Sequence, residues 1–193
     1  MFYLTEVEDH VRVEPKLFGL STNEAVEKQL RETYSNYFSK ELGKVVAVVG
    51  VSDIGEGIII PGDGAAYYRS KFKLLVWKPE MQELVHGIVE EITDFGSFIS
   101  LGGVMRGMVH ISQTMEDYVS FSKSNTLTGK KSNKTLKEGE ECLARIIAIS
   151  YKKKHPKIGL TMRQPGLGKL KWVEQEKKKK KQKAKKKEKE DDS

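Results

Sequence analysis

The most informative part of this chain is residues 85–112, where apolar and polar positions alternate with a period of two. Such alternation is typical of β-strands, because successive side chains of a strand point to opposite faces of the sheet. At residues 98–101, Ile99 and Leu101 fall on one face and Phe98 falls on the other. The pattern predicts three short strands that each have one aliphatic face.

The opposite face of these strands carries aromatic residues. Val109 and Ile111 share the aliphatic face, which leaves His110 beside Phe98, with Phe95 at the bend before Phe98. If the aliphatic faces close a small barrel, these rings form a flat platform on its outside. Single-stranded nucleic acid stacks on such platforms. The alternative, that both phenylalanines are ordinary core residues, remains open at this stage.

The amino-terminal part of the chain predicts a strand followed by a helix. Tyr3–Val13 alternates as a strand. Ser21 and Glu24 have the spacing of a capping box, in which each side chain bonds the other residue's backbone amide. Apolar residues then recur at helical spacing as far as residue 42, and Gly43 is a plausible end of the helix.

Three further strands complete this domain. We expect strands at Lys44–Ile54 and Ile58–Ile60 with a turn at Gly55–Gly57 between them, and a long strand at Ala65–Trp77 after a second turn at Pro61–Gly64. The order of strand, helix and three strands predicts an antiparallel sheet with one main helix on one face.

The chain is expected to divide near Pro79. The predicted organisation is an α+β amino-terminal domain at 1–79, an all-β five-stranded barrel of the OB type at 80–173, and a flexible Lys-rich tail at 174–193. Between residues 112 and 136 the barrel is interrupted by a polar stretch. This stretch is longer than a typical connection, and we interpret it as a loop that is mobile and basic near its end.

Composition narrows the possible functions. The formal net charge is +7, and residues 174–193 contain ten lysines against six acidic residues. A modest positive balance suits a polyanionic partner without requiring one. The chain has one cysteine, Cys142, so it has no internal disulfide. We find no signal-peptide pattern and no apolar run long enough to span a bilayer, so we expect an intracellular protein without a membrane partner.

The sequence offers no catalytic, metal or cofactor site. The four histidines are scattered, without the spacing of known metal motifs. The glycine-rich turn Pro61–Gly64 lacks the lysine of a phosphate-binding loop. Glu90, Glu91 and Asp94 form a carboxylate cluster without a further ligand group at a suitable spacing. We therefore expect no enzymatic activity, no metal and no cofactor.

The second half of the chain resembles the S1-type RNA-binding OB domain. The matching residues are Gly87, Val89, Ile92, Phe95–Phe98, Leu101, Gly107, Val109–Ser112, Gly139, Cys142–Ser150 and Lys157–Thr161. The RNA-binding residues that this resemblance implies are Phe95, Phe98, His110, Arg145 and Lys157. The acidic residue expected at the end of the fourth strand is replaced by Ser150, which puts base recognition at that edge in doubt. Arg145 is either an RNA contact or a structural arginine in a salt bridge.

A longer resemblance covers residues 1–173. The segments Asp53–Gly57, Pro61–Ala65, Glu116–Ser120 and Leu160–Leu170, in this order, resemble the E-prime family of archaeal RNA polymerase subunits, which corresponds to the seventh subunit of eukaryotic RNA polymerase II. The resemblance implies a non-catalytic subunit that forms a stalk with a smaller stalk partner, the F subunit of archaeal polymerases. Its first domain would dock on the polymerase core, and its OB domain would meet the emerging transcript. It also implies a cytoplasmic protein in an archaeon, or a nuclear protein in a eukaryote.

Two protein interfaces are expected on this basis. The residues expected to dock on the polymerase core are Asp53, Gly55, Glu56, Gly57, Gly62 and Gly64. The apolar residues expected to be partly exposed and to bind the F subunit are Leu74, Val76, Trp77, Met81 and Leu84. The alternative function is a free-standing RNA-binding accessory factor, in translation or RNA decay, that shares only the barrel.

Overall fold

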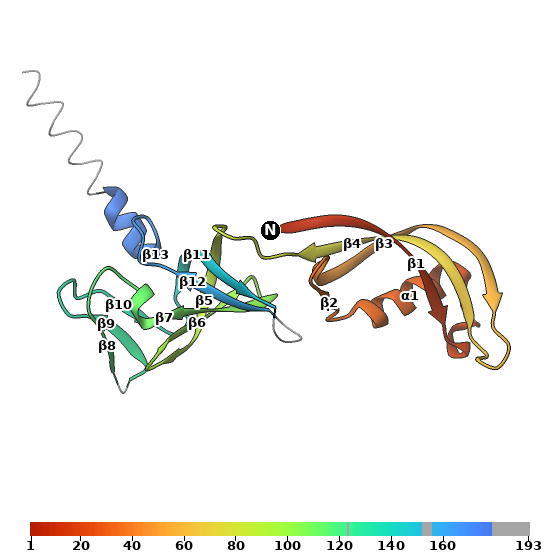
Figure 1. Ribbon diagram of the computed structural model, residues 1–193, viewed down its shortest axis with the longest axis horizontal. Coiled ribbons are helices and arrows are strands. Elements are labelled where there is room, and N and C mark those ends of the chain that lie inside the picture. The colour runs from red at the N-terminus through yellow and green to blue at the C-terminus, as the bar shows by residue number, and fades with distance from the viewer. Residues whose placement is uncertain (123, 152–155, 179–193) are drawn as a thin grey trace, which may run out of the picture. The chain divides into compact units, whose positions relative to one another are not determined.

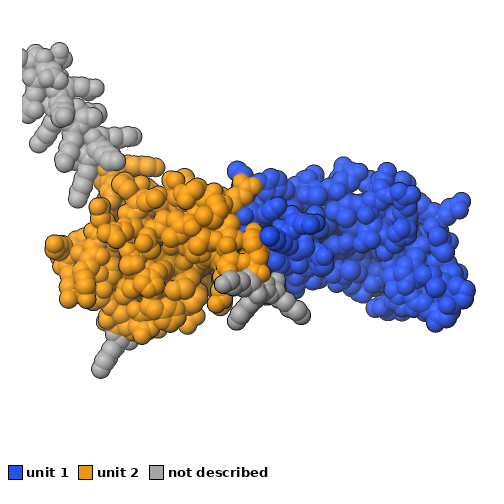
Figure 2. Space-filling model, viewed as in Figure 1, with its two compact units in different colours: residues 1–79 blue, residues 80–193 orange. Residues whose placement is uncertain are grey.

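The computed structural model describes residues 1–122, 124–151 and 156–178. The chain forms two compact units, Met1–Pro79 and the remainder from Glu80 (Figure 2). Most of the Lys-rich tail, residues 179–193, lies outside the described residues.

Unit 1 is a four-stranded antiparallel sheet with one main helix (Figure 1). Its elements are β1 (Phe2–Val13), a short 3₁₀ helix (Pro15–Leu17), α1 (Thr22–Tyr34), β2 (Phe38–Ser39), β3 (Gly43–Ile59) and β4 (Ala66–Trp77). The strand order β1-β4-β3-β2 confirms the predicted α+β class.

The helix begins as predicted and ends earlier. The Ser21 hydroxyl accepts from the Glu24 amide at 3.4 Å, and the Glu24 carboxylate accepts from the Ser21 amide at 3.3 Å, so the capping box is confirmed. The prediction that the helix reaches residue 42 is wrong. Asn36 adopts a left-handed conformation (φ 61°), and Phe38 then pairs with Lys44 as strand β2. Strand pairing therefore takes over where the apolar pattern still suggested a helix.

Strand β3 is also longer than predicted. The pattern indicated two strands with a turn at Gly55–Gly57, and this is wrong, because β3 pairs with β4 both before and after that point. The glycines occupy an irregularity in the register between Ile54 and Gly57. An irregularity of this kind inserts extra residues and bends a strand without reversing its direction. The turn of the β3–β4 hairpin lies at residues 60–65.

The core of unit 1 lies between the helix and one face of the sheet. The helix contributes Val26 and Leu30, and the sheet contributes Phe72 and Leu74, which are all at most 1% exposed. Burying side chains of this size stabilises a fold by about 1.5–3 kcal/mol each. Among the elements that the structure describes, no helix covers the opposite face of the sheet (Figure 1).

Unit 2 is a closed five-stranded barrel, as predicted. Its strands are β5 (Leu84–Thr93), β6 (Gly96–Leu101), β7 (Met105–His110), β11 (Glu141–Ser150) and β12 (Lys157–Thr161). Strand β12 closes the ring by pairing in parallel with β7 and antiparallel with β11. A Cβ atom at Gly107 would lie 2.5 Å from Leu160 Cδ1, so a larger residue here would displace the buried Leu160 side chain where β7 and β12 pair. The prediction that Ile111 continues the third strand is wrong, because Ile111–Gln113 forms a 3₁₀ helix.

The polar stretch after residue 112 is folded, so its interpretation as a loop was wrong. It forms a three-stranded sheet of β8 (Val119–Ser122), β9 (Thr126–Gly129) and β10 (Thr135–Lys137). Leu127 and Leu136 are fully buried. Because the two leucines stand among many polar residues, the period-2 signal was too weak to reveal these short strands.

The chain then returns to the barrel and ends its described part in a helix. Strand β13 (Gly168–Lys169) pairs with β11, and residues 170–178 are helical. Trp172 is buried, and Lys134 Nζ lies 5.4 Å from its ring centroid and 3.0 Å from Glu176 Oε1. Residues 174–178, expected to belong to a flexible tail, thus form part of an anchored helix.

Candidate nucleic-acid interface

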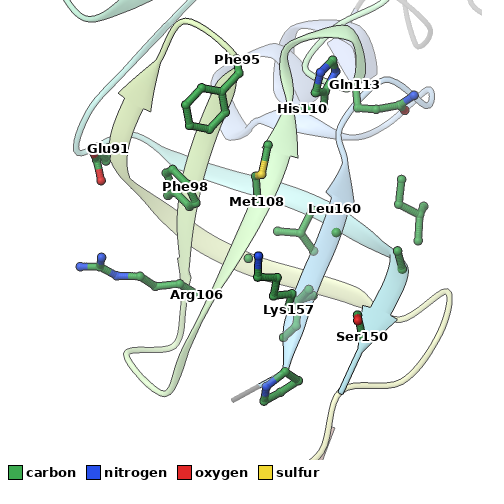
Figure 3. Close-up of a pocket in the computed structure, with 16 residues that line it drawn as sticks. Glu91, Phe95, Phe98, Arg106, Met108, His110, Gln113, Ser150, Lys157 and Leu160 are labelled. Carbon is green, nitrogen blue, oxygen red and sulfur yellow. The ribbon is translucent and has the colours of Figure 1, made fainter. Parts of the chain in front are cut away.

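A groove of about 690 Å³ runs along the outside of the barrel (Figure 3). Its lining residues come mainly from strands β6, β7, β12 and β11, and β12 pairs with both β7 and β11. The alternation of β6 produces this arrangement, because Ile99 and Leu101 are buried inside the barrel while Phe98 is half-buried on the groove side. The interpretation of both phenylalanines as ordinary core is therefore wrong.

Phe95, Phe98 and His110 all line the groove (Figure 3). The rings of Phe95 and Phe98 are 6.1 Å apart and inclined at 84°, so they meet edge to face. The expected flat platform is thus wrong in its geometry. A base can stack on one of the two rings and contact the edge of the other.

The orientation of the His110 ring is fixed by Ser112, two residues further along the chain. The Ser112 amide donates to His110 Nδ1 at 3.3 Å, and the Ser112 hydroxyl lies 2.8 Å from the same nitrogen. Because Nδ1 accepts from an amide, the proton of the neutral ring is on Nε2. The exposed imidazole can therefore offer both a stacking surface and one N–H donor.

Cationic and anionic groups both border the groove. Lys157 is exposed at the start of β12, where it pairs in register with Ser150. Arg106 lies on the neighbouring strand β7, and its Nε is 2.5 Å from Glu90 Oε2. Glu91 adds a negative charge to the same lining. Lys157 is therefore the more suitable partner for a phosphate, since Arg106 is engaged by a carboxylate.

Arg145 is not among the residues that line the groove. It is half-buried, pairs in register with Leu84 and Thr161, and its Nε has no hydrogen-bond partner among the described residues. We therefore leave Arg145 out of the candidate site.

Sequence reasoning missed Met108 and Gln113, which also line the groove. Met108 shares the outward face of β7 with Arg106 and His110, so extending the alternation backwards from His110 would have found it. Gln113 could not be found in this way, because it lies in the 3₁₀ helix. Its Oε1 accepts from the Thr161 hydroxyl at 2.8 Å, which fixes the amide beside the groove.

Two family models match the chain, one in each unit. Residues 8–64 match the SHS2 domain found in the N terminus of Rpb7p/Rpc25p/MJ0397, and residues 78–161 match the S1 RNA binding domain. The DNA-directed RNA polymerase subunit Rpo7 of Saccharolobus solfataricus is 38% identical over 92% of this chain and 99% of its own length. The chain belongs to the Rpo7 family of RNA polymerase subunits.

The chain is also similar to other RNA polymerase subunits. Rpo7 of Sulfolobus acidocaldarius is 39% identical over 91% of this chain and 97% of its own length. RNA polymerase III subunit RPC8 of Saccharomyces cerevisiae is 32% identical over 54% of this chain and 49% of its own length.

Rpo7-family proteins are non-catalytic subunits of the polymerase. Among the described residues, no three His, Cys, Asp or Glu side chains form a potential metal site. No helix in this part of the chain is long and apolar enough to cross a membrane.

The β3–β4 hairpin of this Rpo7-family chain ends in an exposed apolar tip. Ile58, Ile59 and Ile60 are 60%, 68% and 48% exposed. The residues that sequence analysis expected to dock on the core lie in the same hairpin, and all of them are exposed: Asp53, Gly55, Glu56, Gly57, Gly62 and Gly64. Sequence reasoning missed the isoleucines, because they read as an ordinary apolar strand.

A charged cluster holds the turn of this hairpin. Arg12 donates to Asp63 Oδ1 at 2.7 Å and to Oδ2 at 3.0 Å, and the Tyr67 hydroxyl also donates to Oδ2. The hydrogen bonds from Arg12 first, and then from Tyr67, lower the pKa of Asp63 to about 2. The carboxylate thus ties the turn to strand β1.

The expected exposed patch for the stalk partner, the F subunit, requires correction. Leu74 and Val76 are at most 1% exposed in the core under the helix, and Trp77 is 4% exposed. The alternation of β4 points Leu74 and Val76 towards the helix, and Trp77, on the other face, is also buried, so the prediction for these three residues was wrong. Met81 and Leu84 are exposed, at 55% and 58%.

An apolar patch does lie on the uncovered face of the sheet. Leu4 pairs with Leu75, and Leu75 pairs with Ala47 on the other side. Phe2 and Leu4 are exposed on this face, and the exposed Val46 and Val49 lie at two irregularities of strand β3. They lie at the end of the sheet from which the chain leaves unit 1. A patch of this kind marks an interaction surface.

Proposed function

We propose that this polymerase subunit works by dividing two tasks between its units: unit 1 attaches to partner proteins, and the barrel of unit 2 binds the emerging single-stranded RNA transcript. The observation that carries the proposal is that one chain joins an exposed apolar hairpin tip to a barrel with an exposed aromatic groove. We infer that it acts in the cytoplasm of an archaeon, like its archaeal relatives.

The RNA role rests on the chemistry of the groove. Phe98 and Phe95 offer ring faces and edges, His110 offers an N–H, and Lys157 offers a charge. Stacking on aromatic rings is tolerant of sequence, because every base has a π-face. The groove thus suits a transcript of any sequence.

The partner roles rest on two separate exposed surfaces. The hairpin tip presents Ile58, Ile59 and Ile60 from a turn held by Asp63, which suits insertion into an apolar socket on the polymerase core. The exposed residues Phe2, Leu4, Val46 and Val49 of unit 1 suit the stalk partner. Aliphatic and aromatic residues of this kind form the buried centre of stable interfaces.

The alternative, a free-standing RNA-binding factor, accounts for the barrel alone. It leaves the SHS2 match of residues 8–64 and the exposed surfaces of unit 1 without a role. The test is to purify the tagged chain from native cells at moderate salt. We expect the large polymerase subunits and one small partner to be recovered with it. Recovery of ribosomal or RNA-decay proteins in place of polymerase would favour the alternative.

A further inference from the structure

A second aromatic surface lies outside the groove, at the end of the three-stranded sheet β8–β10, where Tyr118 immediately precedes β8. Tyr118 is 69% exposed, more than any other aromatic side chain in the described residues. Lys130, in the turn that follows β9, lies across from it: its amide donates to the Tyr118 carbonyl, and its Nζ is 4.5 Å from the ring centroid. The sheet thus presents one large ring with a cation held over it.

The loop that carries Lys130 is fixed by Asp117. The Asp117 carboxylate accepts from the amides of Lys131 and Ser132 at 2.8 and 2.7 Å, and from the Ser132 hydroxyl at 2.9 Å. These hydrogen bonds, the Ser132 amide first, lower the pKa of Asp117 to about 2. A Cβ atom at Gly129 would lie within 3 Å of the Asp117 carboxylate and the Ser132 hydroxyl, so a larger residue here would displace these side chains. The lysines are therefore presented by a preorganised loop.

We propose that Tyr118 and Lys130, with Lys131 beside them, form a second contact site for single-stranded RNA, which extends the path of the transcript beyond the barrel groove. This proposal rests on the proposed RNA-binding role of the groove. Tyr118 would stack with a base, and the two lysines would meet neighbouring phosphates.

The position of Tyr118 along the chain fits this role. It follows Gln113, which lines the groove, by five residues. Five residues span at most about 18 Å even when fully extended. Barrels of this type engage about 4–16 nucleotides. A strand that fills the groove can therefore reach the Tyr118 site with its next nucleotides.

The composition of the surface favours RNA over a protein. Protein interfaces are depleted in lysine at their centres, and this surface holds the exposed Lys130 over the Tyr118 ring, followed by the exposed Lys131 and Ser132. The exposed Glu116 limits the local positive charge. We therefore assign the larger part of the RNA-binding free energy at this site to stacking on Tyr118, and a smaller part to the lysines. Lys134 differs from its neighbours, because it is engaged by Glu176 and Trp172.

The test compares short and long RNA on the full chain. Mixed-sequence RNAs of about 4 and about 16 nucleotides, the limits of the usual site size, are titrated against wild type, Tyr118→Ala and Phe98→Ala. Tyr37→Ala is the matched control, because Tyr37 is an exposed tyrosine in unit 1. Thermal melting checks that each variant is folded.

We expect Tyr118→Ala to weaken binding of the longer RNA by about 5- to 150-fold, the loss of one stacked base, and to leave the shorter RNA unaffected. Phe98→Ala should weaken both. Lys130→Ala should flatten the dependence of log affinity on log salt by about 0.7 for the longer RNA only. Wild-type binding of the longer RNA by Tyr118→Ala would overturn this inference. Wild-type binding of both RNAs by Phe98→Ala would instead overturn the groove and leave the Tyr118 result to be judged separately.

Discussion

Single side chains set the chemistry of both candidate sites. In the groove, the alternation of one strand separates the buried Ile99 from the half-buried Phe98. At the hairpin turn, Asp63 holds two neighbouring elements through Arg12 and Tyr67. The predictions for the two residues differ: for Phe98 they concern RNA affinity, and for Asp63 they concern the pKa of its carboxyl group.

Replacing Phe98 by alanine should weaken binding of single-stranded RNA by about 1–3 kcal/mol, because a stacked base loses its ring. The loss should be similar for different RNA sequences and depend little on salt. The matched control is Phe18→Ala, since Phe18 is a 50%-exposed phenylalanine in unit 1. Affinities measured by fluorescence anisotropy check the prediction. Equal losses in the two variants would argue against a specific role of Phe98.

The carboxylate of Asp63 should titrate near pH 2 in the folded chain, measured by NMR. Its pKa is lower in the folded chain than the ordinary value of 3.8, so the folded state favours the ionised form. The resulting contribution to stability is complete above about pH 4 and is lost as the pH falls towards about 2. Arg12→Ala should return the pKa towards 3.8. A midpoint that Arg12→Ala leaves unchanged would contradict the proposed tie.

At the scale of elements, the long β3–β4 hairpin and the sheet face determine how unit 1 meets its partners. The hairpin places three isoleucines at its tip, and the described helices leave one face of the sheet uncovered. These surfaces are separate in the fold. Their effects on binding should therefore be separable by mutation.

Ile59→Asp should weaken attachment of the subunit to the polymerase core, because a charge at the tip cannot enter an apolar socket without a partner. RNA binding by the isolated chain should be unchanged. The control is Ile88→Asp, an exposed isoleucine of the barrel outside the groove. Pull-down of core polymerase by each variant gives the measurement. Normal attachment of the Ile59→Asp chain would exclude the tip as the docking site.

Leu4→Asp should weaken binding of the stalk partner by at least about 1 kcal/mol, because it introduces a charge into the centre of the apolar patch. Leu20→Asp is the matched control, since Leu20 is a 44%-exposed leucine elsewhere in unit 1. Isothermal titration calorimetry with the purified stalk partner measures the difference. If the two variants bind alike, the partner lies on another surface.

The elements also show what the sequence could and could not predict. Barrel strands and the capped start of the helix follow from local alternation and local hydrogen bonds, so they were predicted from residues 85–110 and 21–24. The end of the helix and the continuity of β3 depend on pairing with distant residues, such as Phe38 with Lys44. The local pattern of apolar and polar residues does not indicate which distant residues pair. The perpendicular Phe95 and Phe98 rings and the Asp117 loop are likewise products of tertiary packing.

At the scale of the whole molecule, the two compact units carry separate tasks in the proposed function. The SHS2 match falls in unit 1, and the S1 match covers the barrel of unit 2. Of the candidate sites, the aromatic groove was largely predictable, because strand alternation places Phe98 and His110 on the outward faces of β6 and β7. The partner surfaces were less predictable, since the sequence alone does not show that the helix covers Leu74 and Val76.

Crosslinking in a reconstituted transcription elongation complex tests the central claim most directly. The complex contains core polymerase, this chain, its stalk partner and a transcript with a photoreactive base beyond the exit point. We expect the transcript to crosslink to peptides of β6 and β7 that contain Phe98 and His110, and the crosslink to be lost with Phe98→Ala. Crosslinks confined to unit 1, or none to this chain, would contradict the division of tasks between the two units.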